Sequence, residues 1–547
     1  MKNNNGGKIS YFLKKYWAAI LALVLVIAVV LSSVEIYREE VLNIDPDIEY
    51  EEQKTLYLSS EKIDTLNPVI SQGEDVYCLS KLIYSSLFTF DENLSIIPDL
   101  VSEYSVNTDR AYIEITLREG VKWHDGKTFK AADVVFTINT MRAAGTACPY
   151  YDKIKKINSV YAKSSSVVVI YFNNNYNCSL DDLTFPILPS SQYSSAGTFI
   201  AARDGFKPVG TGQYEYKSYS KKKQLRLVPN KNYYDIKAEK NITVTFLPDR
   251  SLASNMMEIN SVSCYVDSSS NRKSIAIDRG YKIYDIPSSN VEFVVFNTES
   301  RYLNSKEMRY AVAYAMDREA ILEKAYMGDG ILTDTIYYPD FLGIKDTLEE
   351  FSHDISKAEG ILSKLGFADK NSDGFKEDNQ GNNFSLRILV NKSNATRNAA
   401  AVLIKKNLDT AGIASEIISL PKQEYLKAIK NKKFDILITG YTIEESYDLR
   451  SFFNGKSEWG YYNYDLFMKA RELERLYTPQ EYSEKYSQLK EAILDQLPYL
   501  PLCYKKMSLI GVSTFEAESL PMFNNIYKNC STWAWSIIKE KNNDDKE

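Results

Sequence analysis

The chain has 547 residues, which is long enough for two or more domains, and 44% of them are hydrophobic, so it can bury sizeable cores. Its formal net charge of -6 and its pI near 5.5 leave no large basic face, which excludes nucleic acid as the main partner. The charge is otherwise uninformative about function.

A candidate membrane segment lies near the N-terminus. The 19 residues from Tyr16 to Val34 carry no charge, and as a helix rising about 1.5 Å per residue they nearly span a hydrocarbon core. Lysines precede this run and glutamates follow it, so everything after Arg38 is expected outside the cell. A cleaved signal peptide is the alternative, but the run exceeds the usual apolar length of about 7 to 15 residues. We expect a cytoplasmic tail over 1–15, an uncleaved anchor over 16–37 and an acidic tether over 38–54.

The next part of the chain, to about Thr198, mixes strands and helices. Leu56-Tyr57-Leu58 predicts a first strand, and helical periodicity runs from Val76 to Phe88. Ser166 to Phe172 is a further strand-like run.

The clearest local pattern runs from Tyr112 to Met141. A strand-like run ends at Leu117, and two tight turns follow, the second at Trp123-His124-Asp125-Gly126. A helix is predicted to begin at Ala131. Its apolar residues lie near one face: Val134, Val135, Ile138 and Met141. We therefore expect a buried helix.

Two glycine motifs could suggest nucleotide binding, and neither fits. In Gly210-Thr211-Gly212 the third glycine of a dinucleotide fingerprint is replaced by Glu215, and a strand rather than a helix is predicted to follow. Gly455-Lys456-Ser457 lacks the earlier glycine of a phosphate-binding loop, because that position is Arg450. We expect structural turns at both places.

The second half of the chain has the pattern of an α/β domain. The apolar run Glu292 to Asn297 predicts a central strand or a crossing between two lobes. From about Ser300 to Leu500, helices alternate with short strands. These are the helices Asp354–Leu365 and Ala395–Ala411 and the strands Leu386–Val390 and Asp435–Thr439. Pro501 to Val512 is a strand-like run that would carry the chain back, and 539–547 form a charged tail.

Several of these motifs together resemble a known family. The run GVKWHDGKTFKAADVVFTINTM, at residues 120–141, is similar to the signature of the family 5 extracellular solute-binding proteins, the peptide and nickel receptors of ABC importers. PVGTGQY at 208–214 resembles the family's PxGTGPY turn, with Gln213 in place of proline. Phe296-Asn297-Thr298 and the block Met308–Glu319 resemble a third family motif. The resemblance covers roughly residues 50 to 535, in order and at family spacing.

The resemblance implies an α/β, two-lobed, periplasmic-binding-protein-like (Venus flytrap) fold with an extra subdomain. On this basis we expect lobe I over 55–297, with the extra subdomain at about 91–204, lobe II over 298–500, and a return to lobe I over 501–538. Family members in Gram-positive bacteria are usually lipoproteins with a cysteine just after the apolar segment. Here the first cysteine is Cys78, so the predicted transmembrane helix would replace the lipid anchor.

Catalytic chemistry has no support in the residues. The chain has two histidines, His124 and His353, and lacks the motifs of serine hydrolases, zinc proteases and thiol oxidoreductases. A hydrogen bond to nearby backbone is the expected role of His124. We therefore predict no enzyme, no catalytic residue and no cofactor.

The cysteines are candidates for disulfide bonds, and one acidic turn is a candidate metal site. Six cysteines fall on the expected extracellular side, where disulfides are allowed, and Cys148 with Cys178 is the best candidate pair, with free buried thiols as the alternative. Asp369-Lys370-Asn371-Ser372-Asp373-Gly374 resembles the start of a calcium loop. The twelfth position is the neutral Gln380, so we predict an acidic turn without metal and leave calcium open.

The predicted ligand site is the segment Gly440 to Asp448. It follows the strand Phe434–Thr439, and ligands of open α/β sheets bind at the carboxyl ends of strands. The segment resembles the family's GWxxDYxxP loop, whose acidic residue meets the α-ammonium group of a peptide. Aligned with the family's loop from its start or from its end, the segment has that acid at Glu444 or Glu445. Tyr441 stands in place of the tryptophan, and Asp448 is close by. An acidic anchor for a cation is retained, although the family's proline is missing.

The resemblance predicts a membrane-anchored extracellular receptor that captures peptides between two lobes and delivers them to an ABC permease and its ATPase. A nickel chelate or another small solute is the first alternative for the ligand. A sensor that reports a peptide signal through its transmembrane helix is the second alternative, and the short tail 1–15 has no room for a signalling domain. The expected location is the cell membrane, with a single pass and the bulk of the chain outside.

Overall fold

The computed structural model describes residues 50–61, 63–174, 178–220, 223–345, 348, 350–443 and 448–538. The chain divides into two compact units, one made of residues 1–53 and 534–547 and the other of residues 54–533. In the first unit, β1 (Tyr50–Glu52) pairs antiparallel with β21 (Ser536–Ile538). The predicted anchor over 16–37 lies outside the described residues. Within the part of the chain that is described, no helix is both long and apolar enough to cross a membrane.

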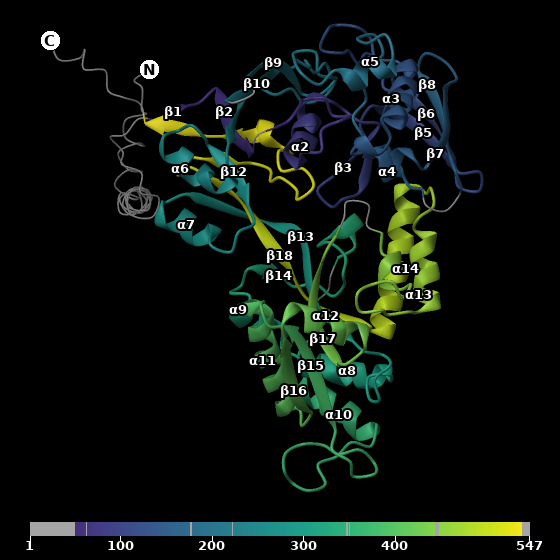
Figure 1. Cartoon of the computed structure of the whole chain (residues 1–547), viewed down its shortest axis with the longest axis vertical. Coiled ribbons are helices and arrows are strands. Elements are labelled where there is room, and N and C mark those ends of the chain that lie inside the picture. The colour runs from purple at the N-terminus through teal and green to yellow at the C-terminus, as the bar shows by residue number, and fades with distance from the viewer. Residues whose placement is uncertain are drawn as a thin grey trace, which may run out of the picture. The chain divides into compact units, whose positions relative to one another are not determined.

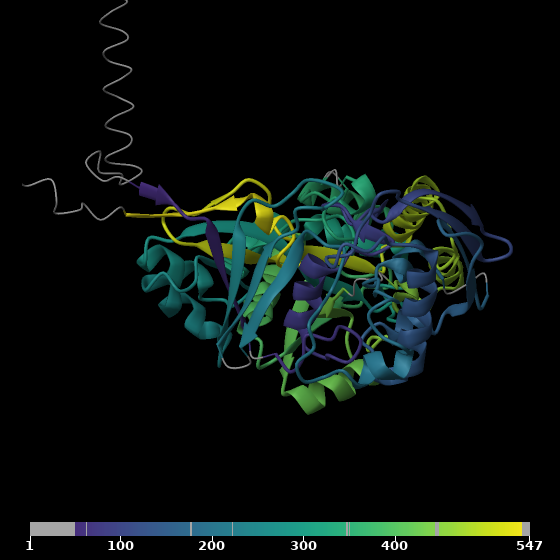
Figure 2. The same cartoon turned by 90° about the horizontal axis from the view of Figure 1, so that it is seen from above.

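The larger unit begins with a four-stranded sheet in the order β2-β11-β10-β9. Its strands are β2 (Thr55–Glu61), β9 (Tyr214–Ser220), β10 (Gln224–Pro229) and β11 (Asn241–Leu247). β2 and β11 are parallel, with Thr55 opposite Asn241, and the other pairs are antiparallel. Figure 2 shows these strands side by side, β2 in purple and the others in teal. The predicted first strand, 56–58, is confirmed.

The glycine motif at 210–212 packs against the end of α2 (Glu74–Ile83). The Gly212 amide donates to the Ile83 carbonyl over 2.8 Å, and a Cβ on Gly210 would lie 1.8 Å from that oxygen. The backbones approach so closely that only glycine fits at these positions. The motif is followed by β9, so the prediction of a structural turn before a strand is confirmed.

A second four-stranded sheet is antiparallel throughout, in the order β5-β6-β8-β7. Its strands are β5 (Val101–Asn107), β6 (Tyr112–Leu117), β7 (Ile157–Ala162) and β8 (Val167–Phe172). It packs against α3 (Ala131–Ala144), the helix predicted from the signature motif. Val134, Ile138 and Met141 are fully buried, whereas Val135 is only half-buried. Asp133 fixes the start of the helix by accepting hydrogen bonds from the Lys130 amide (3.0 Å) and the Trp123 indole (3.3 Å).

A seven-stranded mixed sheet holds the largest part of the core. Its order is β12-β18-β13-β17-β15-β16, and β14 (Gly330–Ile331) also pairs with β18. Its other strands are β12 (Cys264–Asp267), β13 (Lys282–Phe296), β15 (Ser385–Asn391), β16 (Ala414–Leu420), β17 (Ile436–Thr442) and β18 (Tyr499–Gly511). β15 runs parallel to both β16 and β17, and the remaining pairs are antiparallel.

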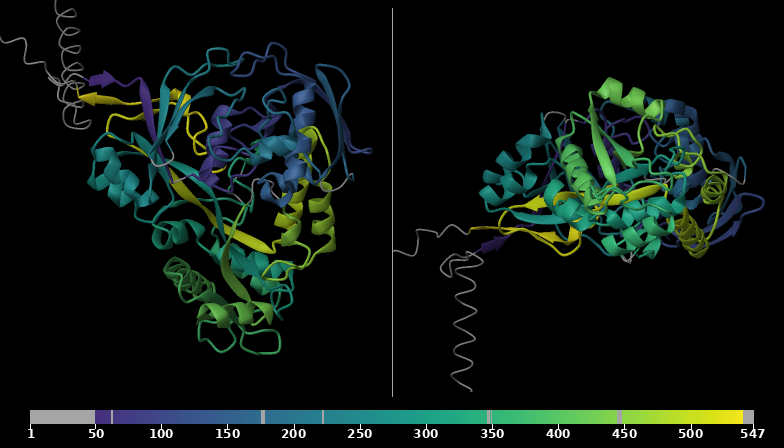
Figure 3. Two further views of the ribbon diagram at one scale, coloured as in Figure 1. Left: turned by 45° about the horizontal axis from the view of Figure 1, so that its top comes forward. Right: turned by 90° about the horizontal axis from the view of Figure 1, so that it is seen from below.

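β13 and β18 are the two long strands of this sheet and lie side by side along their length (Figures 1 and 3). The first half of β13 pairs with the end of β18, and the second half pairs with the start of β18 and with β17. These strands contain the predicted runs 292–297 and 501–512, which are confirmed as strands.

Helices flank the mixed sheet and complete its core. They are α8 (Lys306–Ala315), α9 (Arg318–Ala325), α10 (Ile355–Lys364), α11 (Ala395–Thr410) and α12 (Lys422–Lys430). Two later helices, α13 (Tyr464–Glu472) and α14 (Pro479–Gln496), pack against each other. The helices predicted at 354–365 and 395–411 are confirmed as α10 and α11. Asp354 and Asn394 cap these two helices through their side chains, which explains where each one begins.

Shorter elements complete the larger unit. They are β3 (Phe88–Phe90), β4 (Ile96–Pro98), β19 (Glu516–Ala517), α4 (Tyr151–Ile154), α5 (Ala196–Ala201), α6 (Ala253–Glu258) and α7 (Arg272–Asp278). The predicted helix 76–88 is found as α2, which ends earlier, at Ile83, because the turn at 210–212 packs against its last carbonyl.

The expected disulfide between Cys148 and Cys178 is wrong. All six cysteines are free thiols, and all are buried. Cys148 follows α3, with its amide bonded to Gly145, whereas the Cys178 amide donates to the Glu474 carbonyl between α13 and α14. The two residues are therefore fixed by different neighbours. Burial raises the pKa of Cys148 to about 11 and that of Cys178 to about 12, so both thiols are protonated.

Candidate functional site

The predicted site begins where β17 ends against β13. Asn290 lies opposite Thr442 in the register, and the Thr442 hydroxyl donates to Asn290 Oδ1 over 2.7 Å. The Ile443 amide donates to the Ser289 carbonyl over 2.8 Å. These bonds fix the chain up to Ile443 on the edge of β13. The carboxyl end of β17 is thus held where ligands of open α/β sheets bind.

The structure describes two of the four residues predicted as ligand contacts, Tyr441 and Asp448. Glu444 and Glu445 lie outside the described residues. Tyr441 is half-buried, and its ring packs edge-on against Phe452 with 4.8 Å between centroids. Asp448 accepts from Arg450 through the backbone amide (2.9 Å) and through Nε (2.8 Å) and Nη2 (2.7 Å). Asp448 is therefore already occupied by a cation of its own chain.

The charge state of Asp448 follows from this pairing. Burial alone would raise its pKa, but the hydrogen bonds and positive charge of Arg450 outweigh burial, so the pKa lies below its usual value. Arg450 Nη2 also lies 3.6 Å from Glu474 Oε2. A paired carboxylate of this kind positions the chain around it and is a weak anchor for a ligand.

A polar cleft of about 230 Å³ lies next to this part of β13. One wall contains Ser288, Ser289 and Asn290 of β13, and Ser289 and Asn290 are the residues that hold the end of β17. The opposite wall contains Glu74 and Asp75 from the first turn of α2 together with Arg250, which precedes α6. Hydroxyl, amide and charged groups therefore face a space large enough for a small polar ligand.

Asp75 and Arg250 form a charged pair in this wall. Arg250 Nη2 donates to Asp75 Oδ1 over 2.6 Å, and Asp75 Oδ2 accepts from the Ser60 hydroxyl (2.9 Å) and the Glu61 amide (2.7 Å). Asp75 is buried, whereas the Arg250 side chain is 46% exposed. The buried carboxylate thus holds a guanidinium at the edge of the cleft.

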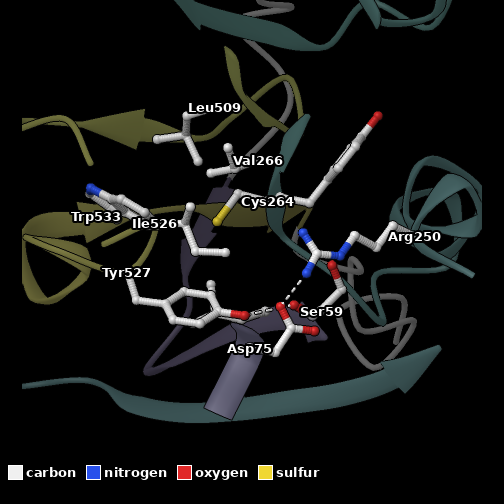
Figure 4. A pocket seen from close by; sticks show the side chains of 11 residues that line it. Ser59, Asp75, Arg250, Cys264, Val266, Leu509, Ile526, Tyr527 and Trp533 are labelled. Atoms are coloured by element: carbon white, nitrogen blue, oxygen red, sulfur yellow. Dashed lines mark hydrogen bonds and ion pairs between the residues drawn. The ribbon is translucent and has the colours of Figure 1, made fainter. Parts of the chain in front are cut away.

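The same pair borders a smaller inner cavity of about 20 Å³ (Figure 4). The Cys264 sulfur, Ile526 and the Tyr527 ring face it, and the Tyr527 hydroxyl donates to the Ser59 carbonyl over 3.0 Å. A cavity of this size holds about one water molecule. It supports the wall of the cleft and is too small to bind a ligand.

A buried ion pair supports the strand below the site. Arg397 donates to Glu292 through Nε (2.7 Å) and Nη2 (2.9 Å), and the Tyr326 hydroxyl donates to the same carboxylate over 3.2 Å. A Cβ on Gly440 would lie 2.4 Å from Arg397 Nη2 and 2.6 Å from Glu292 Oε1. Glycine at 440 is therefore required for this pair to lie across β17.

His124 has the structural role that the sequence predicted. Its backbone amide donates to the Gly210 carbonyl (2.9 Å), its Nδ1 accepts from the Gly210 amide (3.1 Å), and its Nε2 lies 3.1 Å from the Gly212 carbonyl. Nε2 must therefore carry the proton and donate it. Burial lowers the pKa of His124 to about 4, so the ring is neutral at pH 7.

The acidic turn at 369–380 brings together Asp369, Asp373 and Glu377, each with one carboxylate oxygen within 4.8 Å of the others. Those carboxylates also accept bonds within the turn, Asp369 from the amides of Ser372 and Gly374 and Glu377 from that of Lys370. The turn is far along the chain from the residues of the cleft.

Sequence reasoning missed the residues that line the polar cleft. Asp75, Arg250 and Ser288 to Asn290 come from three separate segments, and no local motif joins them. A weak signal was present, since Asp75 falls just before the predicted helix at 76–88 and Asn290 just before the predicted strand at 292–297.

Comparison with known proteins identifies the family. The sequence profile described as "Bacterial extracellular solute-binding proteins, family 5 Middle" matches residues 95–461, which is more than half of the chain. The chain belongs to this family. Its bulk accordingly lies outside the cytoplasm, in an extracellular or periplasmic location, as the resemblance predicted.

This solute-binding protein is similar to named relatives along most of its length. It is 23% identical over 488 residues to the oligopeptide-binding protein AppA of Bacillus subtilis, covering 85% of this chain and 89% of the relative. It is 24% identical over 492 residues to the dipeptide-binding protein of Escherichia coli, covering 82% and 89%. Its fold is similar to the crystal structure of a nickel ABC transporter from Bacillus halodurans, with a TM-score of 0.72, 18% identity, and coverage of 88% and 100%. The expected α/β two-lobed solute-binding-protein fold is thereby confirmed.

Proposed function

We propose that this solute-binding protein captures peptides in the cleft beside β17 and delivers them to the permease and ATPase of an ABC importer. The observation that carries the proposal is the polar cleft of about 230 Å³, which meets β13 at the residues that hold the end of β17. Relatives named as oligopeptide-binding and dipeptide-binding proteins support peptides as the ligand class. The role of the protein would be binding, without chemistry.

The anchor for the peptide's α-ammonium group would be Glu444 or Glu445. Asp448 is a poor candidate because Arg450 already pairs with it. Tyr441, packed on Phe452, would form part of the wall near the anchor. The peptide backbone would form hydrogen bonds with the hydroxyl and amide groups of Ser288 to Asn290. Such bonds do not depend on the side chains of the peptide. Together these contacts would fix the N-terminus of a peptide and tolerate varied side chains.

The two lobes would close on the peptide by a hinge movement. We assign lobe I to 55–297, including the extra subdomain at about 91–204, lobe II to 298–500, and the return to lobe I to 501–538. On these boundaries the chain passes between lobes near the end of β13 and again near the start of β18, and these two segments pair with each other. Ligand contacts made from both sides would favour the closed form, which would dock on the permease.

The test measures peptide affinity of the purified full-length protein by calorimetry. The double change Glu444→Gln and Glu445→Gln should weaken a peptide with a free α-amine by about 10-fold to 100-fold, because a charge-assisted hydrogen bond is lost. The same change should leave the N-acetylated peptide nearly unaffected. Glu424→Gln, an exposed glutamate on α12, is the matched control and should leave both affinities unchanged.

Two outcomes separate the parts of the proposal. Equal loss for free and acetylated peptides would mean that the anchor lies elsewhere in a peptide-binding cleft. If no peptide from two to eight residues binds and a nickel chelate does, the ligand class is wrong and the family assignment stands. The chelate is the second candidate because a structural relative is named as a nickel transporter.

We also propose that residues 16–37 anchor the protein in the membrane. The support is the uncharged run Tyr16–Val34 with lysines before it and glutamates after it. A sensor would need a membrane partner on the same helix, whereas a transport receptor needs only tethering. The protein should pellet with membranes and be released by protease added outside intact cells. Recovery in the medium with an N-terminus beyond Val34 would instead indicate a cleaved signal peptide.

A further inference from the structure

A second cavity, of about 40 Å³, lies away from the polar cleft. Its walls come from three separate parts of the larger unit: the β3–β4 hairpin with the 3-10 helix η3 (Leu180–Leu183), the 3-10 helix η5 (Phe341–Gly343), and the segment from the end of α13 to α14. The Cys178 amide joins the first and third of these parts by donating to the Glu474 carbonyl over 3.0 Å. In Figures 1 and 3, α13 and α14 lie side by side close to the first part.

The cavity combines aromatic walls with two carboxyl groups. Phe90, Phe341, Tyr482 and Tyr486 supply rings, and Asp181 and Glu474 supply the carboxyls. Asp181 is only 6% exposed and Glu474 only 8%. Apolar surroundings of this kind make an unpaired carboxylate costly.

Asp181 and its neighbour Asp182 differ in their partners. Asp182 Oδ2 accepts from the Ser179 amide (2.9 Å), and its Oδ1 lies 2.8 Å from Lys156 Nζ. Among the described residues, Asp181 Oδ2 is buried without a hydrogen-bond partner; Asp182 Oδ1 also lacks a hydrogen bond, but it has the Lys156 ammonium beside it. A buried carboxylate oxygen without a partner, on a side chain that lines a cavity, calls for a donor such as a bound ion.

Among the described charged groups that act most strongly on Asp181 and Glu474, carboxylates outnumber cations by four to three. The carboxylates are Asp181, Asp182, Asp448 and Glu474, and the cations are Lys153, Lys156 and Arg450. Burial and then the negative charge of Asp182 raise the pKa of Asp181 to about 7, and burial raises that of Glu474 to about 7.

We propose that this cavity binds one small monovalent cation of the ammonium type, with Asp181 and Glu474 as its counter-charges and the tyrosine rings as its walls. One such cation neutralises the excess charge and supplies the donor that Asp181 Oδ2 lacks. Ring faces attract an ammonium group, and their walls are poor ligands for a metal ion. Among the described residues, the group of three carboxylates that come close enough to share a metal ion lies in the turn at 369–377. It does not include Asp181 or Glu474.

The volume restricts the cation further. One water needs roughly 10 to 15 Å³ of such space, so about 40 Å³ admits two or three non-hydrogen atoms. Ammonium and methylammonium fit this limit, and tetramethylammonium does not. The size of the cation is therefore a second test beside its charge.

The experiment is thermal unfolding of the full-length protein at pH 8, where ammonium remains protonated, with sodium chloride replaced step by step at constant ionic strength. Ammonium and methylammonium should raise Tm saturably, by about 1 to 2 °C at ten times the Kd, and tetramethylammonium should not. At pH 6 the response should shrink, because protons then compete for the same carboxyls.

Asp181→Asn is the decisive variant, since it keeps the shape of the side chain and removes the excess charge. It should have a higher Tm than the wild type without ammonium and should not respond to ammonium. Asp152→Asn is the matched control, with a side chain that is 85% exposed, and should respond like the wild type.

Three results would overturn the proposal. A response that persists in Asp181→Asn would place the cation elsewhere. Equal responses to ammonium and tetramethylammonium would mean a general effect of replacing sodium rather than binding in the cavity. A Tm that rises on acidification to pH 6 and never responds to ammonium would mean that a proton, not a cation, balances the charge.

Discussion

His124 should destabilise the protein progressively as the pH falls below 6.5. Burial lowers its pKa to about 4 in the folded state, against an ordinary value of 6.5 in the unfolded chain. The unfolded state therefore takes up the proton first, so stability is fully present above pH 6.5 and is lost as the pH falls towards 4. A shift of about 2.5 units corresponds to about 3 kcal/mol in full, of which about 2 kcal/mol is lost between pH 6.5 and 4.5.

The physical cause is the contact between two turns. A protonated Nδ1 can no longer accept from the Gly210 amide, and the attraction of the neighbouring Asp125 carboxylate does not offset the burial of the charge. His124→Asn should lower stability at pH 7.5 and should make the fall in stability between pH 6.5 and 4.5 shallower by about 2 kcal/mol. Denaturant unfolding at a series of pH values measures both effects.

The chain offers a direct check, because it contains only two histidines. Proton–carbon NMR of the imidazoles should show two resonances, and the one lost in His124→Asn should not titrate above pH 5. His353→Asn, at an exposed position, is the control and should leave the pH dependence of stability unchanged. A His124 resonance that titrates near pH 6.5 would refute the reasoning, as would an unchanged pH dependence in His124→Asn.

Two further predictions follow from the packing. Gly440→Ala should lower the free energy of unfolding by about 1 to 3 kcal/mol, because the added Cβ overlaps the Arg397–Glu292 pair; unchanged stability by denaturant unfolding would mean that the pair does not lie across β17. Reducing agent should leave the Tm of the wild type unchanged, and it should also leave the Tm of the double variant Cys148→Ser and Cys178→Ser unchanged, because both thiols are free. A fall in the Tm of the wild type on reduction would reveal a disulfide.

The elements with a strong local signal were predictable. α10 and α11 have capping residues and clear periodicity, and β15 and β17 are short apolar runs. The length of β13 was not predictable. Its first half, Lys282 to Asn290, is largely half-buried and polar, and it is a strand because it pairs with β18, more than 200 residues later in the chain.

The site was predictable only on one side. The end of β17 could be identified because a single stretch of sequence contains both the strand and the acidic residues that follow it. Asp75 and Arg250 could not, because their pairing depends on the fold bringing α2 and the start of α6 together. The error over Cys148 and Cys178 has the same origin, since sequence distance says nothing about which neighbours fix each thiol.

The candidate anchor segment 444–447 is bounded by two contacts of different kinds. Before it, Thr442 bonds to Asn290 on β13, at the edge of the polar cleft. After it, Asp448 pairs with Arg450, which also approaches Glu474 at the wall of the second cavity. A change of charge in that cavity therefore acts on Glu474 and Arg450 before it reaches Asp448. Among the described residues these charged contacts end at Asp448, and any coupling measured between the two sites must be reciprocal.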